Sequence, residues 1–325
     1  YRRQRQMCIR DRRKGAQYGT VTIFTGWKSL GIFLLLFLLA FVSCIKEDSE
    51  VCPPLQVNII VKDKNYFNIS NVPLETRKSE TLPFREYIPT LHYVLRDAET
   101  GSVVEEQGLF RVTGSEATYS ITFCECLPTG KYVLTVWGGM PDDTSLTDAA
   151  LTHIIHANGK EGSDVYLTND TIVYDYQNNY FTVDMERVTG KLLVQVVDLP
   201  TTSRYMDERI DRIYERVNHL FNYLNPISVA KMATWESAEG IVVSSILAPS
   251  TGSAQSVLHL GFYNTLTRSV PDFTPKDVNI TLKRNELTTL KYAYSEERND
   301  FFIYILMGDT WEMIYDCLLY TSDAA

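Results

Sequence analysis

The chain has 325 residues, of which 45% are hydrophobic and 22% are charged. This composition is typical of a globular protein and argues against a disordered chain, and the length suits one large or two ordinary domains. The net charge of −9 is unevenly spread: residues 1–43 carry +7, and the remainder, with 23 basic and 39 acidic side chains, carries −16. A body this acidic repels phosphate backbones, so no nucleic-acid partner is expected.

An apolar run of 13 residues, from Leu30 to Val42, follows the basic segment and leads to Ser43 and Cys44. A membrane-spanning helix needs about 20 apolar residues, so this run is more typical of an export signal. The order Phe41-Val42-Ser43-Cys44 resembles a bacterial lipobox, with Phe41 where that motif usually has Leu. The resemblance implies that Cys44 is the lipidated first residue of the mature protein. The alternative is an ordinary cleaved signal or an uncleaved anchor, with Cys44 an incidental thiol.

The two ends of the chain are excluded from the fold prediction. Residues 7–12 and 317–325 resemble translated sequencing-adapter read-through. The native start is expected between residues 13 and 26, and the export signal is assigned to residues 1–43. Residues 44–54 are predicted to link the lipid to the folded body.

Three cysteines remain in the mature body: Cys52, Cys124 and Cys126. Export permits disulfides, so we expect Cys52 to bridge to Cys124 or Cys126. Such a bridge would close a loop of about 70 residues and contribute roughly 4 kcal/mol by the chain-entropy account. Cys124-Glu125-Cys126 could instead begin a metal site, but zinc needs about four ligands and no partner pair follows. No metal or cofactor is therefore predicted.

Alternation of apolar and polar residues with period two predicts an all-β fold. In the first half, strands are expected at residues 55–62, 90–97, 118–124, 131–138, 163–167, 171–176 and 180–185. In the second half they are expected at residues 190–198, 240–247, 256–264, 277–282, 286–294 and 300–307, with 311–315 a further candidate. Strands at this spacing favour two β-sandwich domains, which we assign to residues 55–186 and 187–316.

Three segments depart from the strand pattern. Apolar residues recur at helical spacing from Asp207 to Leu224, which predicts a helix on the second domain. The β-branched and aromatic content of that segment leaves a pair of strands as the alternative. Long loops are expected at residues 65–86, which include the basic pair Arg77-Lys78, and at residues 138–149.

No catalytic constellation is recognisable, and the chain is not predicted to be an enzyme. His153 and His156 could share a helical face and bind a metal, but without a third ligand ordinary surface or core roles are favoured. Asp142, Asp143 and Asp148 lack the Asp-x-Asp-x-Asp-Gly order of a calcium-binding loop. A solvated acidic loop is the favoured interpretation.

The mature chain begins Cys44-Ile45-Lys46-Glu47-Asp48-Ser49-Glu50-Val51-Cys52-Pro53-Pro54-Leu55. This start resembles that of the Bacteroidales fimbrial anchor-subunit lipoproteins, the FimB-type family of fimbrillin-like proteins. The stretches 127–138 and 188–192 fit the same pattern. The resemblance implies two tandem transthyretin-like β-sandwich domains with a minor helix, a lipid anchor in the outer membrane facing the cell surface, and fimbrial stalk subunits as partners. Such subunits join by β-strand addition.

The resemblance also bears on Arg77-Lys78. In stalk subunits of the family a protease cuts after a basic residue and releases the first strand, but an anchor cut in this way would lose its lipid. We therefore interpret this pair as an ordinary solvated one.

The sequence thus predicts a non-enzymatic anchor or accessory subunit that tethers a fimbrial polymer to the cell. The alternative is a surface glycan-binding lipoprotein of a polysaccharide-uptake system, with Trp137, Trp235 and Trp311 and the 20 tyrosines as a stacking platform. Strand aromatics more often fill a sandwich core, so that alternative is second. A secreted hydrolase is the least favoured class.

Overall fold

The structure is a computed structural model that describes residues 53–123, 127–252, 255–267 and 269–315. The chain forms two compact units, residues 1–55 with 122–128 and residues 56–121 with 129–325. Most of the first unit lies outside the described residues. The sheets discussed below belong almost entirely to the second.

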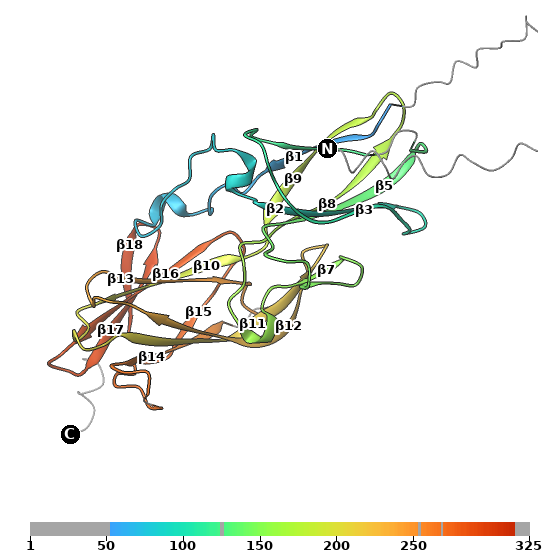
Figure 1. Cartoon of the computed structure of the whole chain (residues 1–325). Coiled ribbons are helices and arrows are strands. Elements are labelled where there is room, and N and C mark those ends of the chain that lie inside the picture. Colours follow the sequence, from blue (N-terminus) through green and yellow to red (C-terminus); the bar gives the residue numbers. More distant parts are fainter. Residues whose placement is uncertain (1–52, 124–126, 253–254, 268, 316–325) are drawn as a thin grey trace, which may run out of the picture. The chain divides into compact units, whose positions relative to one another are not determined.

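Strands make up nearly all of the regular structure, which confirms the predicted all-β fold (Figure 1). The first half contains β1 (Gln56–Val61), β2 (Thr90–Asp97), β3 (Val103–Arg111), β4 (Tyr119–Thr122), β5 (Gly130–Gly138), β6 (Leu146–Thr147), β7 (Thr152–Ile154), β8 (Tyr166–Tyr174) and β9 (Tyr180–Arg187). The second half contains β10 (Gly190–Val197), β11 (Tyr205–Asn218), β12 (Tyr223–Thr234), β13 (Ile241–Leu247), β14 (Ser256–Tyr263), β15 (Val278–Ile280), β16 (Leu287–Ser295), β17 (Asp300–Met307) and β18 (Thr310–Tyr315). Helical structure in the described residues is limited to the 3-10 turns η2 (Ile69–Asn71), η3 (Phe84–Glu86) and η4 (Ala157–Gly159).

The first half builds a seven-stranded sheet in the order β3-β2-β5-β8-β9-β1-β4. β5 pairs antiparallel with β2 on one side and with β8 on the other, whereas β1 runs parallel to β9. In β1, Val57, Ile59 and Val61 are buried and the residues between them are not. This alternation places every second side chain on the core face, because successive side chains of a strand point to opposite faces.

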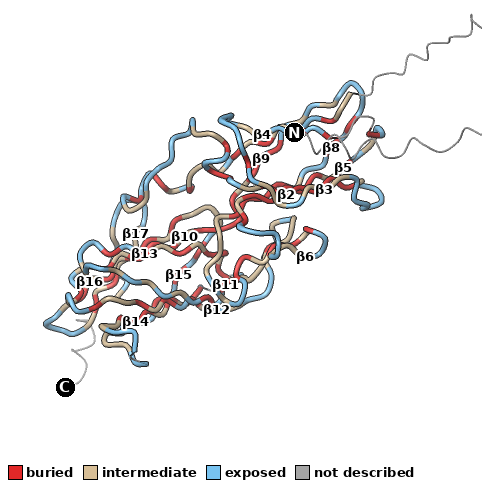
Figure 2. The backbone as a smooth tube through the Cα atoms, viewed as in Figure 1, coloured by how far each residue is buried: buried red, intermediate tan, exposed pale blue. Residues whose placement is uncertain are grey.

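The second half builds two sheets that share one core. Their orders are β13-β10-β16-β17-β18 and β15-β14-β11-β7-β6, with β12 added on β11. Figure 2 shows buried residues running along the strands of both halves. β6 and β7 precede β8 in the chain, yet β7 pairs with β11. The sheets therefore do not divide at a single point in the sequence, and the boundary near Glu186 stays a prediction.

The predicted helix from Asp207 to Leu224 is wrong. The segment is β-structure, as in the alternative, but it holds most of β11 and only the start of β12, which continues to Thr234 over residues where no strand was predicted. β11 and β12 pair antiparallel with a register shift between Ile210 and Ile213, where Arg212 has a φ of 63°. This bulge inserts one residue, so the buried Ile210 and Ile213 are three residues apart, and two strand repeats then lead to the buried Val217 four residues on. The helical spacing in the sequence is thus produced by a bulged strand.

Other strand predictions differ in detail. The two strands expected at residues 163–167 and 171–176 form the single strand β8, and the candidate at 311–315 is confirmed as part of β18. The predicted loop at 138–149 contains β6. The sequence pattern does not predict β3, because it is an edge strand with few buried residues and shows little alternation.

The predicted loop at residues 65–86 is partly packed. Its apolar side chains bury against Leu193 and Leu287; they are Tyr66, Ile69 and Val72. Asn68 fixes this contact, since its amide donates to the Leu287 carbonyl and accepts from the Leu287 N–H, both at 2.8 Å. The loop therefore covers part of the sheet that contains β10 and β16.

The chain leaves the first sheet at Arg187, whose guanidinium is buried. Its Nε donates to Asp164 Oδ1 at 2.8 Å, and its Nη1 donates to Asn285 Oδ1 at 2.7 Å. The same group lies over the ring of Tyr66, 4.1 Å from the ring centre. Residues from four separate parts of the chain thus meet at one positive charge.

Gly190 begins β10 at a point where a side chain would not fit. A Cβ there would lie 2.3 Å from the carbonyl oxygen of Lys283. We predict that Gly190→Ala lowers the free energy of unfolding by about 1–3 kcal/mol, because the backbone carbonyl cannot move aside cheaply. Gly108→Ala is the matched control, since nothing lies within 4 Å of its Cβ position. Equal denaturant midpoints for the two variants would contradict the prediction.

Candidate functional site

Four cysteines singled out in the sequence lie outside the described residues: Cys44, Cys52, Cys124 and Cys126. The described residues beside them form an antiparallel pair. The Phe123 N–H donates to the Leu55 carbonyl at 2.9 Å, and three residues further along each strand the Ser120 hydroxyl contacts Asn58 Oδ1 at 3.1 Å. The two contacts share one register, with position 55 opposite 123 and 58 opposite 120.

The two histidines of the candidate metal site are buried in the fold. His156 Nε2 accepts the Ala248 N–H at 3.0 Å, so its Nδ1 carries the proton and donates to the Lys160 carbonyl at 2.8 Å. The ring of His153 lies 5.6 Å from that of Trp137. Burial lowers the pKa of each histidine to about 4. Within the described ranges, no group of three or more His, Cys, Asp or Glu side chains is arranged to hold a metal.

The remaining candidates do not gather into a site. Asp142 accepts the Thr144 N–H at 3.0 Å within its own loop. Trp137 is fully buried in the large hydrophobic core, and Trp235 is partly buried against the same core. Trp311 on β18 lies elsewhere, with the Lys291 amine 4.7 Å from its ring centre. These positions give no common stacking surface for a sugar.

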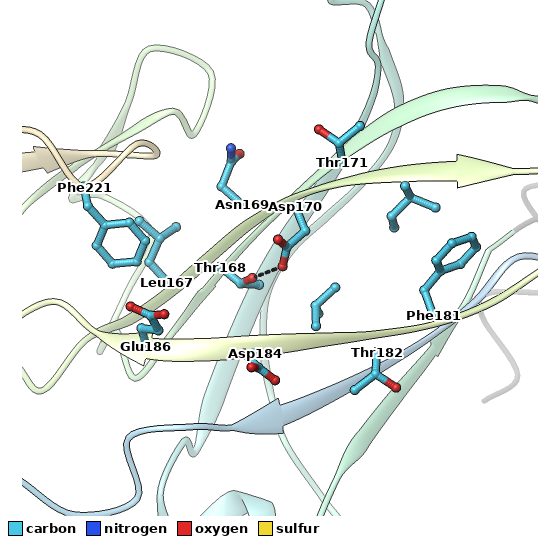
Figure 3. A pocket seen from close by; sticks show the side chains of 12 residues that line it. Leu167, Thr168, Asn169, Asp170, Thr171, Phe181, Thr182, Asp184, Glu186 and Phe221 are labelled. Carbon is cyan, nitrogen blue, oxygen red and sulfur yellow. Dashed lines mark hydrogen bonds between the residues drawn. The ribbon is translucent and has the colours of Figure 1, made fainter.

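A groove of about 380 Å³ opens between β8 and β9 (Figure 3). The two strands pair only at their junction, where Tyr166 faces Arg187 and Leu167 faces Glu186. Beyond that point β8 stays paired with β5 as far as Tyr174, and β9 stays paired with β1. The two strands diverge, and the groove lies between their facing edges.

The groove has an apolar floor and a polar rim. Ile172 and Val183 line it and are almost fully buried. Phe221, from the turn between β11 and β12, lies at the end where the strands meet (Figure 3). The polar lining residues come from both strands: Thr168, Asn169, Asp170, Thr171, Thr182, Asp184 and Glu186.

Three carboxylates line the groove, and they differ in the basic side chains and hydrogen-bond donors that lie near them. Glu186 is paired with Lys62 at 2.7 Å and with Arg284 at 2.6 Å. Burial alone would raise the pKa of Glu186, but these two contacts hold it below its usual value. Asp170 accepts the Thr168 hydroxyl at 2.7 Å, and the Lys62 amine, besides its ion pair with Glu186, interacts electrostatically with Asp184.

Sequence reasoning did not identify this groove. The signal that could have found it is the polar run Thr168-Asn169-Asp170, which separates the strands expected at residues 163–167 and 171–176. In the structure that run remains in β8 and supplies the rim. A polar run inside a strand pattern thus marks an edge that faces solvent.

Other strand edges are also open. β18 ends the five-stranded sheet and carries Met313 and Ile314, whose exposed fractions are 48% and 43%.

Of the helical segments in the described part of the chain, none is long and apolar enough to cross a membrane.

No protein-family model and no curated protein sequence matches this chain. Solved structures do. A proposed polysaccharide-binding protein of Bacteroides thetaiotaomicron matches with a TM-score of 0.53 and 14% identity, over 81% of this chain and 99% of that one. A proposed adhesin of the same organism matches with a TM-score of 0.52 and 16% identity, over 82% and 100%. The fimbrial anchor protein Mfa2 of Porphyromonas gingivalis matches at 0.47 and 10%, over 81% and 100%.

These similarities agree with the resemblance seen in the sequence. The two Bacteroides structures, at 14–16% identity, share the all-β fold of this chain.

The buried imidazole of His156 predicts a loss of stability in acid. Its pKa is about 4 in the folded chain and about 6.5 when unfolded. Its contribution is therefore present above pH 6.5 and lost as the pH falls toward 4, by about 3 kcal/mol. We predict that the difference in unfolding free energy between wild type and His156→Gln shrinks as the pH falls over this range. A parallel pH dependence for wild type and His156→Gln would refute this.

Proposed function

We propose that this chain is a lipid-anchored anchor or accessory subunit of a bacterial surface fimbria. It is held on the outer membrane through Cys44 and joins other subunits by β-strand addition. Three observations support the proposal: the lipobox-like sequence, the family-like start from Cys44 to Leu55, and a fold shared over nearly the full length of two Bacteroides proteins.

The observation that carries the proposal is the position of β1. This strand begins 12 residues after Cys44 and is paired on both sides, with β9 and with β4. Its core-facing side chains are fully or almost fully buried. A pull on a lipid at Cys44 therefore acts on an internal strand whose backbone hydrogen bonds and buried side chains resist it together.

The basic pair Arg77-Lys78 fits an uncut chain. Arg77 is exposed, but Asn65 holds the backbone of Lys78. The Lys78 N–H donates to Asn65 Oδ1 at 2.8 Å, and the Lys78 carbonyl accepts from Asn65 Nδ2 at 3.0 Å. Cleavage after Arg77 or Lys78 would separate β1 and its lipid from the rest of the chain. An anchor therefore has to keep this peptide bond uncut to stay attached to the membrane.

Replacing Cys44 tests the anchor. In cells, Cys44→Ala should release intact fimbriae into the medium, because the polymer would lose its lipid tether. Ser49→Ala, in the same linker, is the control and should leave fimbriae attached. Fimbriae that stay on Cys44→Ala cells, measured by electron microscopy and by immunoblot of the medium, would show that the anchor proposal is wrong.

A surface glycan-binding role is the second candidate. It is favoured by the likeness to the proposed polysaccharide-binding protein, at a TM-score of 0.53. The separate placement of the three tryptophans weighs against it. Saturable oligosaccharide binding by the purified chain, together with normal fimbriation of cells lacking it, would favour this candidate over the anchor.

We further propose that Cys52 pairs with Cys126. Continuing the register of the described pair by three residues would place position 52 opposite 126. Facing residues of antiparallel strands have Cα atoms about 4.5–5.5 Å apart, which lies within the range that disulfides span. In that register both positions would share a face with Asn58 and Ser120, because side chains alternate along a strand.

This pairing predicts different outcomes for the two candidate cysteines. Cys126→Ser should leave Cys52 free to react with an alkylating reagent, whereas Cys124→Ser should leave it protected. Peptide mapping by mass spectrometry without reduction gives the readout. Protection of Cys52 in the Cys126→Ser variant would overturn the assignment, and free Cys52 in the wild-type chain would remove the disulfide altogether.

A further inference from the structure

We propose that one end of the first sheet rests against the headgroup region of a zwitterionic bilayer. This end is formed by the start of β1, the turn between β8 and β9, and the turn between β2 and β3. The inference rests on the lipid anchor proposed at Cys44, and it adds the surface that the anchored chain presents to the membrane.

Backbone pairing brings these three parts of the chain to the same end of the sheet. β1 and β9 begin together at the pair Gln56–Tyr180, and the Gln56 N–H donates to the Asn179 carbonyl at 2.8 Å. The turn between β8 and β9 therefore lies beside the point at which the chain enters β1 (Figure 1). The same row continues across the sheet through the pairs Tyr174–Gly130, Tyr132–Asp97 and Arg96–Val103.

Exposed apolar and aromatic side chains gather at this end. Val173, Tyr176 and Tyr180 flank or form the turn between β8 and β9, and Val103 and Val104 begin β3. All five are exposed. Tyrosine is enriched where a bilayer meets water, because its ring is apolar and its hydroxyl can stay hydrated. This set of side chains therefore suits the headgroup region of a membrane.

The turn that presents the tyrosines is already ordered. Asp175 Oδ1 accepts the Asn178 N–H at 2.7 Å, and Asn178 Nδ2 donates to the Val173 carbonyl at 3.1 Å. The ring of Tyr176 packs edge-on against the buried ring of Tyr174, with the ring centres 6.3 Å apart. Contact with a membrane therefore costs little conformational entropy at this turn.

The tether makes a weak contact sufficient. Gln56 lies 12 residues after Cys44, so the linker spans at most about 40 Å when fully extended. A linker this short gives the attached surface an effective concentration of the order of millimolar at the membrane. A contact with a dissociation constant of about 1 mM is then occupied for much of the time. The same surface would bind a membrane poorly without the lipid.

Charge determines which headgroups fit. Asp97, Glu99 and Asp175 lie at this end, against the exposed Lys131. The chain after residue 43 carries a net charge of −16. An anionic surface would repel this end of the sheet, whereas zwitterionic headgroups would not.

Tryptophan reporters in the lipidated chain test the inference. The chain is purified from membranes and reconstituted into vesicles of phosphatidylcholine with brominated acyl chains, which quench a tryptophan that reaches the lipid. Tyr180→Trp reports on this end, and Met232→Trp on β12 is the matched control, since the two native side chains are 58% and 56% exposed. After subtraction of the wild-type emission, we expect Tyr180→Trp to lose fluorescence and Met232→Trp to keep it.

Two further comparisons locate the contact. Val173→Thr combined with Tyr176→Ser should reduce the quenching of Tyr180→Trp to the level of the control. Val242→Thr combined with Leu220→Ser changes two exposed apolar residues elsewhere and should leave the quenching unchanged. Circular dichroism melting checks that the variants are folded. Mixing brominated phosphatidylglycerol into the vesicles should weaken the quenching, and stronger quenching there would overturn the preference for zwitterionic headgroups.

Flotation of the vesicles on a density gradient separates this inference from the proposed function. Equal quenching of Tyr180→Trp and Met232→Trp in chains that float would overturn the inference and leave the lipid anchor standing. Chains that do not float would overturn the lipid anchor and the inference with it. A blue shift of Tyr180→Trp without quenching, growing with protein density, would make this end an interface between copies of the chain and also overturn the inference. Quenching of Tyr180→Trp alone, in a chain whose Cys44→Ala variant sheds no fimbriae, would support the inference and overturn the fimbrial role.

Discussion

The buried guanidinium of Arg187 is the constraint on which the arrangement of this molecule depends. A buried charge is tolerated only when it is paired and hydrogen-bonded, so its partners must be held in place. Those partners, Asp164, Asn285 and the ring of Tyr66, lie far apart in the chain. Satisfying one charge therefore fixes the loop after β1, the start of β8 and the turn before β16 together. It also holds the end of β9 at the point where β8 begins to diverge from it.

That divergence gives the groove its character. Open strand edges are a hazard, because they pair with any extended chain. The acidic side chains beside this gap lie on different faces: Asp170 shares the face of the buried Ile172, whereas Asp184 and Glu186 lie on the face opposite Val183. Glu186 is paired with Lys62 and Arg284. β1, by contrast, is paired on both sides, with β9 and with β4, so removing it from the sheet would break backbone hydrogen bonds to two strands.

Local patterns predicted most strands to within a few residues, and they failed where the pattern depended on contacts with other parts of the chain. The spacing of Ile210, Ile213 and Val217 is helical because Arg212 lies in a bulge, which only pairing with β12 creates. The spacing of His153 and His156 suits a pair of metal ligands, but spacing says nothing of burial. Their neutral, buried state follows from contacts with Ala248 and with the loop around them.

The sequence by itself determined the features written in contiguous residues: a short apolar run followed by a lipobox-like Phe41-Val42-Ser43-Cys44, an acidic body, and a period-two alternation that makes the chain all-β. These depend on local composition and on the geometry of a single strand, so no distant contact is needed to read them. Only the tertiary structure decided that β1 is paired on both sides, that β6 and β7 join the later sheets, and that β8 and β9 pair only where they meet. Which strand edges pair depends on partners more than a hundred residues away, as with Val61 of β1 and Met185 of β9, and alternation along one strand carries no information about its neighbour.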